Sequence, residues 1–236
     1  MQTKMAKRLF LGYQLFAVFL ICPLAYILWL ERLQGQHRLV LYLYLVPVLF
    51  GYIAPAIGTN LLKLWEFKAG IRLGRFTLVH GFMLGGPSVL LAWLCADIFL
   101  AGPGWLQTLK SAMVLGPLIG FWNWWFDTWA IRNGIAVMYN KPAYEGKSAA
   151  SITGDYAPLY YGIFGAGFGV YIHFIFERQV MEGSGSLQIL LVVFSVITII
   201  APAAGHALFS YYKHGYWGLT PYLSDRQNLL ENQNEV

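Results

Sequence analysis

Six long apolar stretches occupy most of this chain of 236 residues. A helix needs about 20 mainly apolar residues to cross the hydrocarbon core of a bilayer. In that core every backbone polar group must be hydrogen-bonded internally, which favours helices for such stretches. The sequence therefore predicts an all-α fold, a polytopic transmembrane bundle of about six spanning helices. The predicted spans are residues 9–30, 39–58, 76–100, 109–131, 157–176 and 187–211.

The composition indicates the same class of protein. Only 11% of the residues are charged and 58% are hydrophobic, whereas soluble domains are about 25% charged. This excludes an ordinary cytosolic enzyme, a disordered chain and a nucleic-acid-binding module. Cys22 and Cys95 lie in apolar stretches without a CxxC spacing, which predicts neither a disulfide framework nor a zinc site. We expect residues 1–236 to form one integral membrane domain with no cysteine-based metal site and no nucleic-acid partner.

The distribution of Lys and Arg predicts the orientation, because cytoplasmic loops carry an excess of these residues. With the N-terminus inside, twelve of them fall on the inner side and four on the outer side. Both termini are therefore predicted to be cytoplasmic, in the cytoplasmic membrane of a bacterium or an endoplasmic-reticulum-like membrane of a eukaryote. The inner set is Lys4, Lys7, Arg8, Lys63, Lys68, Arg72, Arg75, Arg132, Lys141, Lys147, Lys213 and Arg226, and the outer set is Arg32, Arg38, Lys110 and Arg178.

Two further features of the sequence concern how the helices pack and what covers the inner end of the bundle. Gly162, Gly165 and Gly169 share one face of the fifth predicted span, and small residues on one face let helix backbones approach closely. The cytoplasmic loop 132–156 mixes Gly, Pro, Tyr and charged residues without low complexity. We expect it to form an ordered cap over the inner mouth of the bundle.

Ionisable residues at membrane depth are costly and are functional candidates by default. Asp127 lies in a Trp-rich run near the inner end of the fourth span, and His80 and His206 lie near the inner ends of the third and sixth spans. Asp155 ends the cytoplasmic loop. These four residues could serve as acids, bases or metal ligands, and Asp127 is the first candidate, as proton donor or metal ligand. The structural alternative pairs Asp127 with Arg132, bonds His80 to a neighbouring carbonyl, leaves Asp155 in water and assigns the Trp run to an interfacial belt.

A second set of residues is predicted to contact a substrate. Asn123 precedes Asp127 by four residues, which places both on one helix face. Arg132 suits an anionic headgroup or a diphosphate, and aromatic faces stabilise a cation. Asn60 closes the second span on the same side. The full set is Asn123, Arg132, Trp122, Trp125, Tyr156 and Asn60.

The Asn123-x-x-x-Asp127 spacing is similar to half of the aspartate-rich motif of intramembrane prenyltransferases. Ile131 stands where the next carboxylate would be, and that departure puts metal–diphosphate binding in doubt. In size and helix-rich hydropathy the chain also resembles the small membrane-bound terpene cyclases. That resemblance implies an acid that protonates an alkene or epoxide, with Asp127 as the first candidate and Glu66 as the second.

We therefore expect a membrane-embedded enzyme that acts on a hydrophobic small molecule, a lipid or an isoprenoid, at a cytoplasm-facing cavity. The chemistry would be acid–base or cation-stabilising, of a cyclase or prenyl-transfer kind. The alternatives are a small transporter, an accessory subunit of a larger membrane complex, or a haem-b electron carrier that uses His80 with His206. The sequence leaves the cofactor and the homo- or hetero-oligomeric state open.

Overall fold

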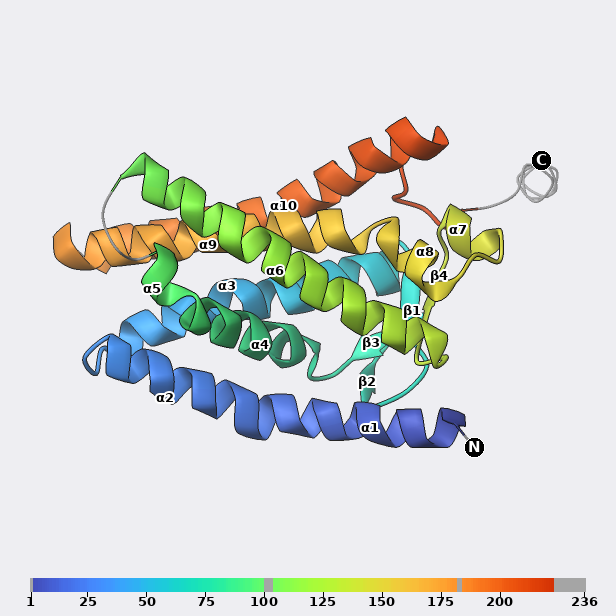
Figure 1. Cartoon of the computed structure of the whole chain (residues 1–236), viewed down its shortest axis with the longest axis horizontal. Coiled ribbons are helices and arrows are strands. Elements are labelled where there is room, and N and C mark those ends of the chain that lie inside the picture. Colours follow the sequence, from blue (N-terminus) through green and yellow to red (C-terminus); the bar gives the residue numbers. More distant parts are fainter. Residues whose placement is uncertain (1, 100–103, 182–183, 223–236) are drawn as a thin grey trace.

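In the part of the chain that the computed structural model describes, six helical rods lie roughly side by side along one axis (Figure 1). The structure describes residues 2–99, 104–181 and 184–222, without the side chains of 2–3, 98–99, 177–181 and 184–187. Arg226 and the side chain of Arg178 lie outside this description. The rods are α1–η1–α2 (Gln2–Phe16, Ala17–Ile21, Cys22–Arg32), α3–η2 (His37–Pro55, Ala56–Leu61), α4 (His80–Leu94), α6 (Trp105–Arg132), α9 (Ala157–Met181) and α10 (Ser184–His214).

Among the described residues, four helices are long and apolar enough to cross a membrane. They are Lys4–Arg32, His37–Leu61, Ala157–Phe176 and Gln188–His214. The helix α4 is apolar but has only 15 residues, and a short helix α5 (Ala96–Phe99) follows it. The helix α6 has 28 residues, but its Trp, Asn and Asp content makes it less apolar than these four. The chain is thus mostly helical with four helices of membrane-spanning character.

Two short antiparallel ribbons join the rods at one end, and the all-α prediction misses them. Strand β1 (Trp65–Phe67) pairs with β4 (Ala136–Met138), and β2 (Arg72–Leu73) pairs with β3 (Phe76–Thr77). Strands of two or three residues are too short to show a period-two pattern in the sequence. The third predicted span consequently begins at His80 rather than at residue 76.

The segment between α6 and α9 is ordered. After β4 it forms the short helices α7 (Lys141–Tyr144) and α8 (Ala149–Gly154). Asn140 and Ser148 cap these helices, because their side-chain oxygens accept hydrogen bonds from the backbone N–H groups of Ala143 and Ser151. The segment packs over the same end of the bundle as the ribbons (Figure 1).

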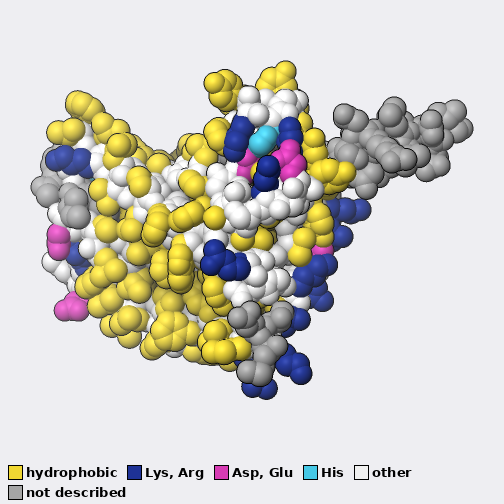
Figure 2. All heavy atoms as spheres, turned by 45° about the vertical axis from the view of Figure 1, so that its right-hand side comes forward, with side chains coloured by type: hydrophobic (Ala, Val, Ile, Leu, Met, Phe, Trp, Pro, Cys, Tyr) yellow, Lys and Arg dark blue, Asp and Glu magenta, His cyan; other side chains and the backbone are white. Residues whose placement is uncertain are grey.

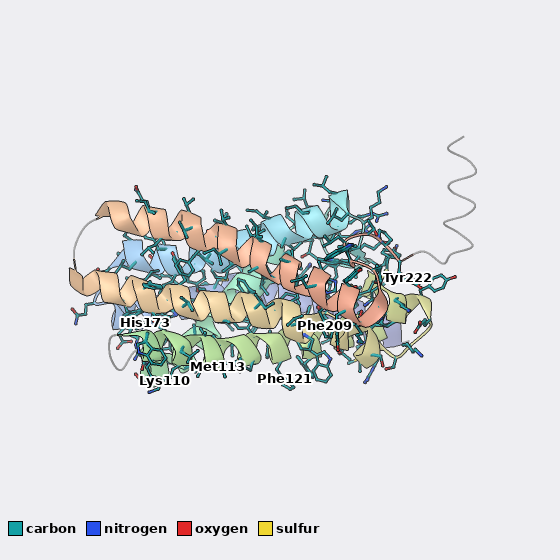
Figure 3. The ribbon with its side chains drawn as sticks, turned by 90° about the horizontal axis from the view of Figure 1, so that it is seen from above. Lys110, Met113, Phe121, His173, Phe209 and Tyr222 are labelled. Atoms are coloured by element: carbon teal, nitrogen blue, oxygen red, sulfur yellow. The ribbon has the colours of Figure 1, made fainter. Side chains whose placement is uncertain are left out.

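The Lys and Arg residues of the predicted inner set that the structure describes gather at this end, which we call the basic end. It holds the start of α1, the four strands, α7, α8 and the end of α10 (Figure 1). Figure 2 shows Lys and Arg over this end and hydrophobic side chains over the adjoining face. In Figure 3 Lys110 lies toward the opposite end from Phe209 and Tyr222, and Lys110, Met113 and Phe121 point away from the bundle along α6.

The interface between α6 and α9 runs along the three glycines singled out in the sequence, two of which have no room for a Cβ. A Cβ on Gly169 would lie 2.4 Å from the carbonyl oxygen of Ser111, and one on Gly165 would lie 2.5 Å from that of Leu115. A Cβ on Gly162 would lie 3.7 Å from the oxygen of Gly116. The predicted close approach is confirmed, and α6 is thereby fixed against α9 along its length.

Candidate functional site

A cavity lies at the basic end, among α3, η2, α4, α6, α9, α10 and the β1–β4 ribbon. It offers about 110 Å³ to the centres of water-sized molecules. Its wall is mostly aromatic, which suits a hydrophobic ligand or a cation. The aromatic residues are Phe50, Trp65, Phe67, Tyr139, Tyr156, Tyr160, Tyr161 and Tyr216, and the other polar side chains are His80, Asp127, Asn140, His206 and Thr220.

Asp127 and Tyr156 form a carboxyl–phenol pair on this wall. The Tyr156 hydroxyl donates a hydrogen bond of 2.7 Å to Asp127 Oδ2. Burial, and then the nearby Asp127 carboxylate, hold the pKa of Tyr156 well above its usual value, so the phenol keeps its proton and acts as the donor. Among the described residues no Lys, Arg or His forms an ion pair with Asp127. The predicted alternative of an Asp127–Arg132 pair is therefore absent from the structure.

The two predicted histidines line the same cavity from different helices. His80 begins α4, and its Nδ1 lies 3.3 Å from the Thr77 hydroxyl oxygen. Its ring packs among Trp65, Phe67 and Phe76, with centroids 5.6 to 6.2 Å away. The predicted bond from His80 to a backbone carbonyl is thus replaced by a contact with a hydroxyl.

His206 comes from α10, at one edge of the Tyr160 ring, with the two ring centroids 6.5 Å apart. Within the described residues its buried Nδ1 has no hydrogen-bond partner. A buried imidazole nitrogen without a hydrogen-bond partner is energetically costly.

A second, smaller space of about 20 Å³ adjoins the cavity, and His80, Leu84, Asp127 and Tyr161 line both. Trp122 and Asn123 face this second space. Asn123 is buried and its Nδ2 donates to the Ile119 carbonyl oxygen at 2.9 Å. Trp122 and Asn123, two of the predicted substrate contacts, therefore line the smaller space together with Asp127 but do not line the main cavity.

Three other predicted substrate contacts do not line either space. Trp125 is 53% exposed on the outside of α6, as expected for an interfacial tryptophan. Arg132 ends α6. Asn60 accepts a hydrogen bond of 2.9 Å from the Arg75 backbone N–H, which joins η2 to the turn between β2 and β3. The structure brings none of the three to the cavity.

Glu66, the second candidate acid, faces away from the cavity. Its strand neighbours Trp65 and Phe67 line the cavity, and alternate strand residues point to opposite faces. Glu66 accepts a hydrogen bond from the Tyr139 hydroxyl and lies 2.5 Å from Lys68 Nζ. These two hydrogen bonds, that of Lys68 first, lower the pKa of Glu66. The residue is an anion that stabilises the β1–β4 ribbon.

Asp155 is also placed outside the cavity, in a buried ion-pair cluster. Its carboxylate is 1% exposed and lies 2.7 Å from Lys213 Nζ and 2.6 Å from His214 Nε2. Asn140 Nδ2 lies 3.5 Å away and also donates to the Ile152 carbonyl oxygen at 3.1 Å. The structural alternative that leaves Asp155 in water is therefore wrong, and the structure does not bring this predicted acid to the cavity. Asp155 joins the end of α10 to the segment that precedes α9.

This arrangement predicts a structural effect for Asp155→Asn. Loss of the charge weakens two hydrogen bonds to a buried acceptor, and we expect the free energy of unfolding to fall by about 1–2 kcal/mol. Lys213 is 44% exposed, so water compensates part of its loss. Thermal unfolding in detergent measures the change. A variant of parent stability would contradict the structural role.

Several cavity residues were not singled out in the sequence. Tyr160 and Tyr161 lie in the fifth predicted span, where aromatic residues are common, and Tyr216 and Thr220 follow the last span. Tyr160 and Tyr161 occupy the first turns of α9 next to Tyr156, and that local clustering of Tyr residues was the available signal.

No protein-family model, curated protein or solved structure matches this chain. Within the described residues there is also no group of three or more His, Cys, Asp or Glu side chains arranged to hold a metal ion. The interpretation of the site therefore depends on its own geometry.

Proposed function

We propose that this protein is a membrane-embedded enzyme that rearranges a hydrophobic isoprenoid or lipid substrate by proton transfer. The observation that carries the proposal is the Asp127–Tyr156 pair on the wall of an aromatic cavity. A carboxyl group with no described cation beside it is suited to give a proton to a carbon–carbon double bond. The Tyr156 hydroxyl, which donates to Oδ2, stabilises the carboxylate that remains after the proton has left.

The proposed reaction needs no co-reactant. Asp127 donates its proton to one alkene carbon, the π electrons form the new C–H bond, and the neighbouring carbon becomes a cation. Aromatic faces of the wall stabilise this cation through their quadrupoles. The Asp127 carboxylate then removes a proton from a carbon next to the final cation, which forms the product double bond and restores the acid. His80 and His206 are the supporting bases.

A terpene-cyclase-like reaction fits this arrangement better than prenyl transfer to a diphosphate-activated carbon. The described residues place a single carboxyl group on the cavity wall, Asp127. The carboxylate pairs that hold a divalent ion against a diphosphate would need at least one more there. We therefore propose proton-initiated chemistry on the hydrocarbon part of the substrate.

We further propose that all six rods cross the membrane and that the basic end is cytoplasmic. Support comes from the gathering of Lys and Arg at that end and from the position of both the start of α1 and the end of α10 there (Figures 1 and 2). A cytoplasmic basic end follows from the excess of Lys and Arg in cytoplasmic loops.

Cysteine labelling in intact cells tests this topology. Gln36 lies in an exposed turn at the opposite end, and Lys147 lies in an exposed turn at the basic end. In a variant with Cys22 and Cys95 replaced by Ala, a membrane-impermeant maleimide is expected to label Gln36→Cys in intact cells. Lys147→Cys is expected to react only after permeabilisation. The reverse pattern would show the opposite orientation.

A haem-b electron carrier is the second candidate, because His80 and His206 line one cavity. Absorbance of the purified protein separates the two candidates. A Soret band that shifts on reduction and disappears in both His80→Ala and His206→Ala would support the carrier and contradict the enzyme proposal.

The enzyme proposal is tested by an untargeted lipid and terpenoid profile of cells with and without the protein. A new metabolite, or consumption of an existing one, is the expected result. An unchanged profile in a host supplied with C15, C20 and C30 isoprenoid precursors would count against the enzyme and favour a transporter or a subunit of a larger complex.

A further inference from the structure

The segment that follows α10, residues 215–222, has two different faces, and we call it the strap. Tyr216, Gly218 and Thr220 line the cavity. The intervening Trp217 and Leu219 are 53% and 38% exposed. The strap therefore closes the cavity with one face and presents a tryptophan and a leucine outward with the other.

The strap is attached at both ends. Lys213 and His214, directly before it, bind the buried carboxylate of Asp155. At its far end the Tyr222 backbone N–H donates a hydrogen bond of 2.7 Å to the Tyr139 carbonyl oxygen. Near its start the Tyr216 hydroxyl accepts a hydrogen bond of 3.2 Å from the Lys141 backbone N–H. These contacts fix which face of the strap is turned outward.

Two glycines set the path of the strap between these attachments. Gly215 has φ +76° and Gly218 has φ +67°, a backbone region that residues with a Cβ rarely adopt. A Cβ on Gly218 would also lie 2.7 Å from the Ser210 hydroxyl oxygen and 3.0 Å from His206 Nε2. The strap thus turns back onto α10 and lies directly over His206.

The outward face of the strap continues onto α10. Trp217 stacks on Tyr211, with ring centroids 4.6 Å apart and planes 21° apart. Tyr211, Tyr212 and Leu208 are 52%, 90% and 62% exposed. A contiguous exposed apolar patch of this kind marks a site of contact with a membrane or another protein.

Three observations favour a membrane. The patch extends a helix of membrane-spanning character, Gln188–His214, and begins within its last two turns. Tryptophan and tyrosine prefer the headgroup region of a bilayer. The end of α10, which carries the patch, also lies at the basic end (Figure 1), where Lys and Arg complement lipid phosphate groups.

We propose that the strap lies in the phospholipid headgroup region, with Trp217 and Leu219 directed toward the acyl chains. The wall that closes the cavity then faces the bilayer, and displacement of the strap admits an amphiphile whose hydrocarbon chain is already dissolved in the membrane. The identity of that amphiphile as a substrate depends on the proposed function, but the position of the strap does not.

The test uses the full chain, with Cys22 and Cys95 replaced by Ala, in vesicles of phosphatidylcholine and phosphatidylglycerol. A fluorophore is attached to Leu219→Cys, to Trp217→Cys and, as the matched control, to Lys147→Cys, which lies at the same end but in an exposed turn. Each variant is used only if it elutes as a single symmetric peak in detergent.

A nitroxide-labelled lipid is expected to quench the probes at 217 and 219 several-fold more strongly than the probe at 147. Aqueous iodide is expected to give the reverse order. Iodide quenching at 217 and 219 equal to that at 147 would overturn the proposal in favour of a water-exposed strap. Probes shielded from both quenchers would overturn it in favour of a contact with a second copy of the chain.

These readouts report depth and need no substrate. A strap in the headgroup region together with an unchanged metabolite profile would reject the proposed enzyme while retaining the membrane contact. A new metabolite together with a water-exposed strap would do the opposite.

Discussion

Asp127→Asn is expected to reduce product formation by at least about 100-fold, the lower end of the range for removing a general acid. The amide has nearly the same shape as the carboxyl group, but it cannot deliver a proton to a double bond. The Tyr156 hydroxyl, 2.7 Å away, can still donate to the amide oxygen, so the fold should persist. Product is quantified by mass spectrometry relative to the amount of folded protein.

Asp97→Asn is the matched control for this variant. The control carries the same Asp-to-Asn substitution at the opposite end of the molecule. The Asp97 side chain is 90% exposed there and pairs with Arg32. We expect parent levels of product from it. Parent levels from a folded Asp127→Asn variant would reject Asp127 as the acid. Loss of product from both variants would point to a general effect on expression or folding.

The sequence predicts the level in the membrane at which the site lies, but not the contacts within it. Asp127, His80 and His206 were selected because each stands near the same end of a different apolar stretch. Rods of similar length packed side by side bring such positions together, and all three line one cavity. Their chemical roles remain predictions.

Asp155 and Glu66, the two candidate acids that do not line the cavity, make their contacts across long sequence separations. Asp155 is held by Lys213 and His214, and Glu66 by Tyr139, 73 positions away. Local patterns contain no information about such pairs. The β1–β4 ribbon, which turns Glu66 from the cavity, joins strands of three residues each, and no periodicity can be read from so few positions.

The interface between α6 and α9 shows the opposite case, where a short pattern was sufficient. Glycine at positions 162, 165 and 169 already predicts a close helix contact. The structure adds the partner, since the backbone of α6 at Ser111 and Leu115 fills the space in which Cβ atoms would stand. The identity of that partner depends on how all the rods pack.

The double variant Gly165→Ala/Gly169→Ala is expected to lower the free energy of unfolding by at least about 1–3 kcal/mol, the cost of overpacking at one site. Each new methyl carbon would lie within 2.5 Å of a backbone oxygen of α6. A backbone oxygen cannot rotate away as a side chain can, so α6 and α9 must separate. That separation would also displace Asp127 on α6 from Tyr156, which directly precedes α9. Thermal unfolding in detergent, followed by tryptophan fluorescence, measures the effect.

Gly12→Ala is the control that separates this clash from the general effect of replacing glycine in a helix. A Cβ on Gly12, in α1, would meet no atom within 4 Å. Alanine is more favourable than glycine in a helix by about 1 kcal/mol, so this variant should be as stable as the parent or more so. The two results together test the packing directly. If Gly165→Ala/Gly169→Ala also unfolded at the parent temperature, α6 and α9 could not approach as closely as described, and the juxtaposition of Asp127 with Tyr156 would lose its structural basis.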